Sequence, residues 1–316
     1  MKRIVVIGEI LVEIMADTTG DGFGDPIALT GPYPSGAPAI FIDQVARLGQ
    51  PCGIVSAVGD DDFGRLNIER LKRDGVDTSA IHLSTDRPTG TAFVRYRDTG
   101  ERDFVFNIEH SACGQIRQSA ASDAMVDGAD HLHVMGSSLT SEAMIALNLD
   151  AAARIKSRGG TVSFDPNLRK EMLGDPKMRQ AMKDVLASTD VFLPSGDEMT
   201  LLTQSSDKTG ALSEIFDLGV AAVVHKQGAH GAIHYEPQRA VAVSGIKVEE
   251  IDPTGAGDCF GGAFVTFWLR GLEPEQALRR AAAAGALAVT VRGPMEGAAT
   301  LDQIEALLAN RTDPDT

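Results

Sequence analysis

Residues Ile246–Phe267 read IKVEEIDPTGAGDCFGGAFVTF. A strand-like segment, IKVEEI, leads into a glycine-rich turn. Aromatic residues then recur at the spacing of one helix face, at Phe260, Phe264 and Phe267. The first amides of a helix have no backbone partner, and the helix dipole makes this end positive. Because Gly255 and Gly257 let a ligand approach the main chain closely, the turn predicts a site for an anion such as a phosphoryl group.

An acidic residue, Asp258, stands at the same helix end. A carboxylate there can simply cap the helix. Beside a bound phosphate it can also orient and deprotonate an attacking hydroxyl. The anion site next to it favours the second interpretation, in which Asp258 is a general base.

Other nucleotide and catalytic motifs are missing from the sequence. No Walker A run G-x4-G-K-[ST] occurs, and the dinucleotide pattern G-x-G-x-x-G fails because Gly261 comes one position late. There is also no HExxH, GxSxG or EF-hand loop. A nicotinamide-dependent dehydrogenase is therefore a remote alternative.

Outward from this turn, short apolar runs alternate with helical patterns. The runs lie at 3–7, 53–58, 131–135, 161–164, 191–193 and 220–225. Helical stripes lie between several of them, at Phe41, Val45 and Leu48 and again at Met144, Leu147, Ala151 and Ile155. This alternation predicts an α/β fold with a Rossmann-like, mostly parallel sheet and helices on both faces.

Two stretches, 10–33 and 89–107, break the alternation. In the second, FVRYR and RDFVF flank Asp98-Thr99-Gly100, which predicts a hairpin with a turn of the Asp/Gly type. Apolar and polar residues alternate in both arms, so we expect a small antiparallel sheet that projects from the main domain. An exposed decorative hairpin is the alternative. The expected main domain then comprises 1–9, 34–88 and 108–316.

The composition is that of a globular protein with an acidic surface. Hydrophobic residues make up 43% and charged residues 23% of the 316, and 44 acidic against 29 basic residues give a net charge of −15. This balance argues against a nucleic-acid partner. The three cysteines lie far apart, which suits a reducing, cytoplasmic setting. Glu9 and Glu13 interrupt the N-terminal apolar run, and no run reaches the roughly 18 residues of a membrane helix.

The segment DPTGAGDCFGGAF, Asp252–Phe264, closely resembles the C-terminal signature of the ribokinase-like (PfkB) carbohydrate kinases. The resemblance covers nearly the whole chain. It includes the opening VVIGEILVEI, the segments PSGAPAIFIDQVARLG and SAVGDDDFG, FDPNLR at Phe164–Arg169, FLPSGDEMTLL and VVHKQGAHGA. The FDPNLR segment is similar to that of fructokinases and 2-keto-3-deoxygluconate kinases, so the chain is placed near the fructokinase, tagatose kinase and 2-keto-3-deoxygluconate kinase branch.

The resemblance implies a ribokinase-like fold, in which a small β-sheet lid covers a sugar. It implies an ATP-dependent kinase that uses Mg²⁺ and transfers the γ-phosphate to a primary hydroxyl. It also implies activation by K⁺ and a homodimer formed through the lid. A ribokinase and a sugar-sensing protein without catalysis remain as alternatives.

Site residues follow from the matched motifs. Asp258 is the implied base, and the implied anion hole comprises Gly255, Ala256 and Gly257. The implied sugar-binding residues are Glu13, Gly36, Ala37, Asn107 and Arg169, with Asp258. The implied nucleotide-binding residues are Asn167, Ser195, Lys226, Gly228 and Gly231, with Gly255 and Gly257; Lys226 is expected on an edge strand. Glu198 is implied to bind Mg²⁺ through water, and Asp252 to lie at a monovalent-cation site.

The sequence departs from the family at three positions. Ser35 replaces a glycine, Ile40 replaces a sugar-contacting asparagine, and Ser195 replaces the first asparagine of N-x-x-E. In place of the arginine that recognises a sugar acid, the second lid arm continues with Asn107 and Glu109. We therefore expect a neutral ketohexose such as tagatose or fructose, against which Ile40 can pack; 2-keto-3-deoxygluconate is the alternative.

Overall fold

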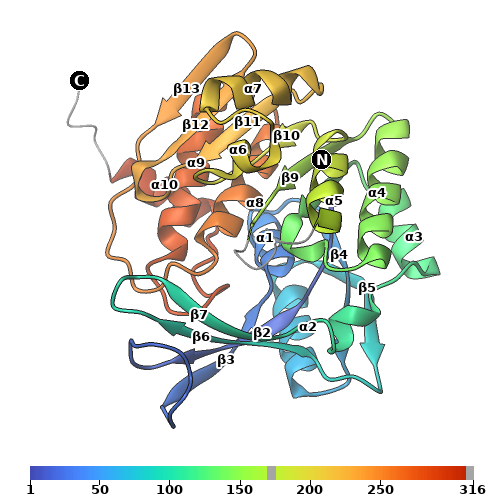
Figure 1. Ribbon diagram of the computed structural model, residues 1–316, viewed down its shortest axis with the longest axis vertical. Helices are drawn as coiled ribbons and strands as arrows, with labels where there is room; N and C mark the ends of the chain where they lie inside the picture. Colours follow the sequence, from blue (N-terminus) through green and yellow to red (C-terminus); the bar gives the residue numbers. More distant parts are fainter. Residues whose placement is uncertain (169–175, 311–316) are drawn as a thin grey trace.

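The computed structural model describes residues 1–168 and 176–310 and contains two sheets (Figure 1). The large sheet has nine strands in the order β13-β12-β11-β10-β9-β8-β1-β4-β5. In chain order these are β1 (Ile4–Ile7), β4 (Cys52–Gly59), β5 (Asp77–Ser84), β8 (His131–Met135), β9 (Thr161–Asp165), β10 (Val191–Phe192), β11 (Ala222–Lys226), β12 (Ala232–Glu236) and β13 (Arg239–Val243).

The strands from β5 to β11 are all parallel, whereas β12 and β13 form an antiparallel edge. The chain winds from β1 to β4 and β5 on one side, then returns to β8 on the other side of β1. The strand order therefore reverses at the carboxyl end of β1, which is where open α/β sheets bind their ligands.

Helices cover both faces of this sheet (Figure 1). One face carries α1 (Ala37–Arg47), α2 (Asp62–Asp74), α8 (Ala256–Leu269), α9 (Pro274–Ala288) and α10 (Leu301–Ala309). The other carries α3 (Ala120–Asp127), α4 (Glu142–Ser157), α5 (Pro176–Leu186), α6 (Glu198–Leu202) and α7 (Lys208–Asp217). Successive residues of β1 supply both cores, Ile4 and Val6 to the first and Val5 and Ile7 to the second.

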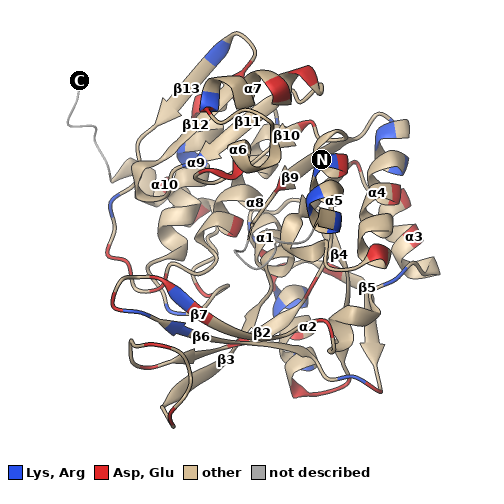
Figure 2. Cartoon of the chain, viewed as in Figure 1, with Lys and Arg blue, Asp and Glu red and all other residues tan. Residues whose placement is uncertain are grey.

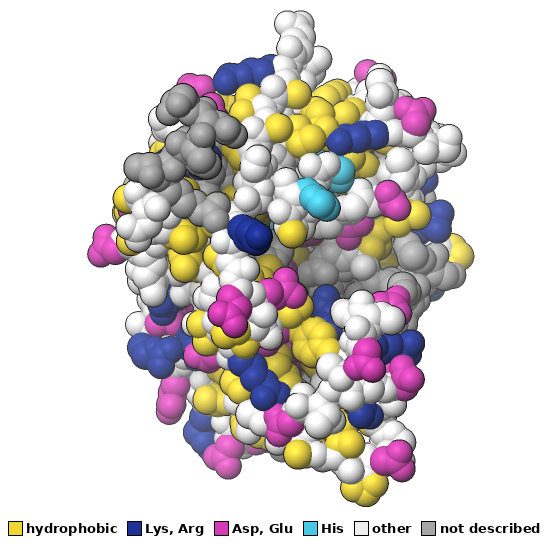
Figure 3. Space-filling view, turned by 90° about the vertical axis from the view of Figure 1, so that its left-hand side faces the viewer, with side chains coloured by type: hydrophobic (Ala, Val, Ile, Leu, Met, Phe, Trp, Pro, Cys, Tyr) yellow, Lys and Arg dark blue, Asp and Glu magenta, His cyan; other side chains and the backbone are white. Residues whose placement is uncertain are grey.

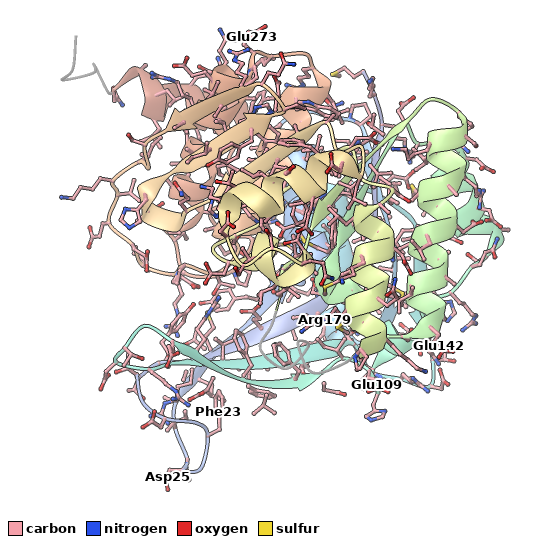
Figure 4. All side chains as sticks on the ribbon, turned by 45° about the horizontal axis from the view of Figure 1, so that its top comes forward. Phe23, Asp25, Glu109, Glu142, Arg179 and Glu273 are labelled. Atoms are coloured by element: carbon pink, nitrogen blue, oxygen red, sulfur yellow. The ribbon has the colours of Figure 1, made fainter. Side chains whose placement is uncertain are left out.

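The small sheet has the order β3-β2-β6-β7 and lies against one end of the main domain (Figure 1). Its strands are β2 (Leu11–Ala16), β3 (Leu29–Ser35), β6 (Gly90–Tyr96) and β7 (Arg102–Asn107). The loop between β2 and β3, with Phe23 and Asp25, projects away from the main domain at one end of this sheet, and Glu109 lies at the other end (Figure 4). We call these four strands the lid sheet.

The expected fold class is confirmed, as are the hairpin and the expected strands of the large sheet. The hairpin closes where expected, with the Gly100 amide donating to the Arg97 carbonyl at 2.9 Å. Three expectations are wrong. The small sheet is mixed rather than antiparallel, because β2 and β6 at its centre run parallel. Residues 246–250 form no strand, because the chain leaves the sheet after β13 and does not pair with the free edge of that strand. Lys226 is not on an edge strand, since β11 pairs with both β10 and β12.

Basic and acidic side chains are interspersed along the chain (Figure 2). The face with the ends of the lid sheet likewise mixes hydrophobic, acidic and basic groups (Figure 3). In the ranges 1–168 and 176–310, no helix combines the length and apolar character needed to cross a bilayer.

Candidate active site

The glycine turn before α8 has the conformation that the sequence predicts. Gly255 is the N-cap residue with φ of 80°, and a Cβ on it would lie 2.3 Å from the carbonyl oxygen of Pro294. Only glycine can occupy this position without strain. A Cβ on Gly257 would meet only the Nζ of Lys226, at 3.8 Å. The protein therefore leaves open space at Gly257, at the positive end of a long buried helix, whereas the amide of Ala256 lies 3.4 Å from the carbonyl oxygen of Pro253.

Asp258 is the third residue of α8 and is half-buried. The side-chain amide of Asn167 lies 3.4 Å from its Oδ1. Asn167 itself has a left-handed backbone with φ of 40°, and its backbone amide donates to Oδ1 of Asp165 at 3.1 Å. Asparagine tolerates this conformation better than most residues. The turn after β9 thus brings Asn167 against the predicted base.

A buried ion pair lies beside this turn. The ammonium of Lys226, at the end of β11, contacts the carboxylate of Asp165, at the end of β9. Burial disfavours the charge on Lys226, but the carboxylates of Asp165, Glu198 and Asp258 outweigh it and raise the pKa of the ammonium. Lys226 is therefore a fixed cation next to Gly257.

Glu198 begins α6, and its carboxylate is held by two backbone amides. Leu168 donates to Oε1 at 2.8 Å and Ser195 to Oε2 at 2.6 Å. Burial, followed by the negative charge of Asp165, raises the pKa of Glu198 to about 7. The described residues contain no cluster of three or more acidic, His or Cys side chains able to hold a metal ion. Few direct protein ligands are what Mg²⁺ needs when phosphate and water supply the rest.

Asp252 lies directly before the turn and is 2% exposed. Its Oδ1 accepts from the Tyr96 hydroxyl at 2.7 Å and from the Thr254 amide at 3.0 Å, and its Oδ2 from the Gly293 amide at 2.9 Å. A carboxylate offers about four lone-pair sites, so one remains for a cation. A carboxylate oxygen of Asp252 is the type of ligand that a potassium ion binds.

Residues that were predicted to bind a sugar lie where the chain passes from β1 into the lid sheet. The Ser35 hydroxyl donates to Oε1 of Glu13 at 2.7 Å, and both residues are buried. Gly36, with φ of 110°, turns the chain into α1 at Ala37, and a Cβ on it would lie 2.5 Å from the Glu9 carbonyl oxygen. These residues adjoin the point where the strand order reverses.

Other predicted residues lie elsewhere. Gly228 lies in the exposed turn between β11 and β12, which follows Lys226, and Gly231 ends this turn and is buried. Asn107 pairs with Thr91 and lies on the face of β7 opposite to Phe106. Because Tyr96 and Phe106 share the face that meets Asp252, Asn107 points away from the site, and we do not include it in the sugar pocket. Arg169 lies outside the described residues.

Comparisons with known proteins agree with this geometry. Residues 1–301 match the family model described as pfkB family carbohydrate kinase. The chain belongs to the pfkB family of carbohydrate kinases.

Three relatives illustrate its place in the pfkB family. A 2-dehydro-3-deoxygluconokinase of Thermoproteus tenax is 32% identical, over 98% of this chain and 94% of the relative. An E. coli crystal structure, assigned provisionally as a ribokinase II and solved with ATP and Mg²⁺, is 47% identical with a TM-score of 0.92, over 98% of this chain and 100% of that one. A Vibrio cholerae fructokinase variant with fructose, ADP and potassium ion is 30% identical with a TM-score of 0.84, over 98% of each chain.

One departure from the pfkB pattern has a different consequence from the one expected. Ile40 is 2% exposed, and its Cγ2 lies 3.2 Å from where a Cβ on Gly255 would be. It therefore packs beneath the glycine turn as part of the core. The expectation that Ile40 packs against the sugar is not supported, because it has almost no free surface.

Sequence reasoning missed several residues of this pfkB site. Asp165 stands within the FDPNLR segment, and a charged residue at the end of an apolar run was the available signal. Glu9 accepts from the hydroxyls of Ser137 and Ser138 at 3.0 and 2.6 Å. Tyr96 and its partner Thr254 are brought together only by the packing of the lid sheet, which no local pattern reveals.

Proposed function

We propose that this pfkB kinase transfers the γ-phosphoryl group of ATP to a primary hydroxyl of a neutral ketohexose of the fructose or tagatose class. One observation carries the proposal: Asp258, the open amides at Gly257 and the ammonium of Lys226 lie together at one helix end. A base, an anion site and a fixed cation are what phosphoryl transfer to an alcohol requires.

The sugar lies between the lid sheet and the carboxyl end of β1, where Glu13 accepts hydrogen bonds from its hydroxyls. Asp258 takes the proton of the primary hydroxyl while the hydroxyl oxygen of the sugar forms a bond to the γ-phosphorus. The bond to the bridging oxygen breaks, and ADP leaves with that electron pair. The amides of Ala256 and Gly257 and the ammonium of Lys226 stabilise the charge on the transferring group. Closure of the lid excludes water from this step.

The nucleotide extends from the turn toward Ser195, Gly228 and Gly231, with Asn167 beside the phosphates. Glu198, whose carboxylate is oriented by the amides of Leu168 and Ser195, would hold Mg²⁺ through water, and the ion would supply positive charge to the phosphates. Lys226 cancels only one of the charges of Asp165, Glu198 and Asp258, which favours a divalent cation nearby.

The lid arginines support a neutral sugar. Arg95 donates to the carbonyls of Gly22 and Thr19, and Arg97 pairs with Asp103, on the face away from the site. Arg102 is on the inner face but lies over the Phe104 ring, next to Tyr96. Tyr96 is four residues, about 13 Å, along β6 from the partner of Glu13. Among the described residues, no arginine of the lid sheet is therefore placed to pair with the carboxylate of a sugar acid bound near Glu13.

The relative from Thermoproteus tenax, named as a 2-dehydro-3-deoxygluconokinase, favours a sugar acid as second candidate. The test measures ADP release and kcat/KM for fructose, tagatose, ribose and 2-keto-3-deoxygluconate side by side. We expect a ketohexose to exceed the sugar acid. A preference for the sugar acid above tenfold would reject the lid argument, and no ADP release with any sugar would reject the kinase assignment.

We also propose that the enzyme forms a homodimer through the lid sheet and works in the cytoplasm. Leu29 and Val105 of the lid sheet are 40% and 53% exposed, so these two apolar side chains are available for contact with a second copy of the chain. The three cysteines are free and buried, as in a reducing compartment. Sedimentation of wild type and Val105→Glu tests the dimer, and cell fractionation tests the location.

A further inference from the structure

A single hydroxyl joins the lid sheet to the segment that shapes the glycine turn. Tyr96 ends β6, and its hydroxyl lies 2.7 Å from Oδ1 of Asp252 and 2.7 Å from Oγ1 of Thr254. Both partners are buried, at 2% and 5% exposure. Thr254 immediately precedes Gly255, so a residue of the lid contacts the chain one position before the predicted anion hole.

The carboxylate that receives this hydroxyl also fixes the two loops around the turn. It accepts the amide of Thr254 on one side and the amide of Gly293 on the other. The next residue, Pro294, supplies the carbonyl against which Gly255 is packed. Any rotation of Asp252 therefore moves both walls of the turn together.

The hydrogen bond has a defined direction. A carboxylate can only accept a hydrogen bond, so the phenol O–H of Tyr96 is the donor in its contact with Asp252. The hydroxyl donates to Asp252 and holds its Oδ1 in place, which fixes the carboxylate in the orientation that the Thr254 amide also requires.

We propose that Tyr96 is a positioning residue, which orients Asp252 when the lid is closed and so aligns the amides of the anion hole. The inference rests on the proposed kinase function and adds a coupling between sugar binding and phosphoryl transfer. A lid without this hydroxyl still covers the sugar, but the turn beneath it is no longer held in a single position.

A second lid contact makes this role separable from docking of the lid. Arg292 donates to Asp17 at 2.8 Å and to the carbonyl of Ala16 at 3.2 Å. Asp17 has no contact with Asp252. Asp17 also accepts from the Thr30 hydroxyl within the lid sheet, at 2.6 Å. Asp17→Asn therefore weakens contacts of the lid that do not involve Asp252, and Tyr235→Phe, on β12, removes a phenol hydroxyl away from the lid.

The first test is a kinetic double-mutant cycle with Tyr96→Phe and Asp252→Asn, using whichever sugar the wild type accepts. We expect Tyr96→Phe to lower kcat about tenfold or more, with the Kd for ATP of the free enzyme unchanged. In a protein that already carries Asp252→Asn, adding Tyr96→Phe should not lower kcat further. A kcat within twofold of wild type, an equal loss in Asp17→Asn, or multiplying losses in the double variant would each overturn the proposal.

The second test needs no substrate. Hydrogen exchange of the peptide that contains residues 252–260 should be faster in Tyr96→Phe and unchanged in Tyr235→Phe and Asp17→Asn. Unchanged exchange in Tyr96→Phe overturns the proposal whether or not a sugar is phosphorylated. If the wild type accepts no sugar but exchange rises as expected, the coupling stands and the kinase assignment is what fails.

Discussion

Lys226 and Asp165 form a buried ion pair that spans strand β10, from the end of β11 to the end of β9. Strand β10 has two residues, and the chain after it continues beside β11 through a single bridge between Ser195 and Lys226. Each partner of the ion pair is nearly inaccessible to water, with side-chain exposures of 10% and 2%. A charge placed in this way cannot swing toward solvent, so the cation beside the glycine turn has a fixed position.

Removing one partner of this pair should be costly. Lys226→Met leaves the Asp165 carboxylate buried beside Glu198, and we expect the free energy of unfolding to fall by about 3–5 kcal/mol. Lys226→Met/Asp165→Leu should recover much of that loss. Urea unfolding provides the measurement. Lys156→Met, which breaks the more exposed pair with Asp190, should cost less than about 1 kcal/mol. If Lys226→Met also lost less than about 1 kcal/mol, the interpretation of Lys226 and Asp165 as a buried ion pair would be contradicted.

Asp258→Asn should reduce kcat by about 10²–10⁴-fold, the usual contribution of a general base. The side chain is of similar size, so the melting temperature and the Kd for ATP should stay near those of wild type. Coupled ADP release and calorimetric titration provide the two measurements. A variant with more than half of the wild-type kcat would remove Asp258 from the mechanism.

The two glycines of the turn should respond differently to a methyl group. Gly255→Ala forces a left-handed residue against the Pro294 carbonyl, and we expect a loss of at least about 1–2 kcal/mol of stability. Gly257→Ala meets only open space, so the fold should keep its stability. Its kcat should nevertheless fall, because the methyl group occupies the space of the phosphoryl group. Equal activity of Gly257→Ala and wild type would show that no ligand approaches this amide.

The raised pKa of Glu198 predicts a pH dependence of stability. The unfolded carboxyl loses its proton near pH 4.5 and the folded one near pH 7. Between these values the folded state binds more protons, so the free energy of unfolding should fall as the pH rises. Glu198→Gln removes this contribution. Urea unfolding of both proteins from pH 4.5 to 7.5 should show their difference changing over this window; parallel curves would refute the shift.

Potassium should raise activity above sodium or choline at matched ionic strength. A cation bound to the free lone pair of Asp252 would help to hold this carboxylate, and with it the turn that forms the predicted anion hole, in a fixed position. The comparison needs only the ADP assay in three chloride salts, and Asp252→Asn should abolish the difference. Identical rates in all three salts would exclude a cation role at this carboxylate.

Local patterns predicted the features that depend on local sequence. The glycine spacing around Gly255 fixes a turn and a helix start, and alternation around Asp98 fixes a hairpin. The segment 246–250 has a similar strand-like pattern but forms no strand, because a strand needs a pairing partner and this segment does not pair with the free edge of β13. Contacts between distant segments were not predicted because they depend on the tertiary fold. The ion pair of Lys226 with Asp165 depends on the register in which β9, β10 and β11 pair.

The strand order also determines when the enzyme becomes competent during its synthesis. The lid sheet is complete once residue 107 has left the ribosome, whereas the glycine turn is held in place by Pro294. At translation rates of about 5–20 residues per second, roughly ten to forty seconds separate these two events. For most of that interval the nascent chain has the strands of the lid sheet without the proposed base, and even after Asp258 has emerged the glycine turn lacks the Pro294 carbonyl that packs against Gly255. The part of the chain that holds the turn therefore follows the lid sheet by almost two hundred residues.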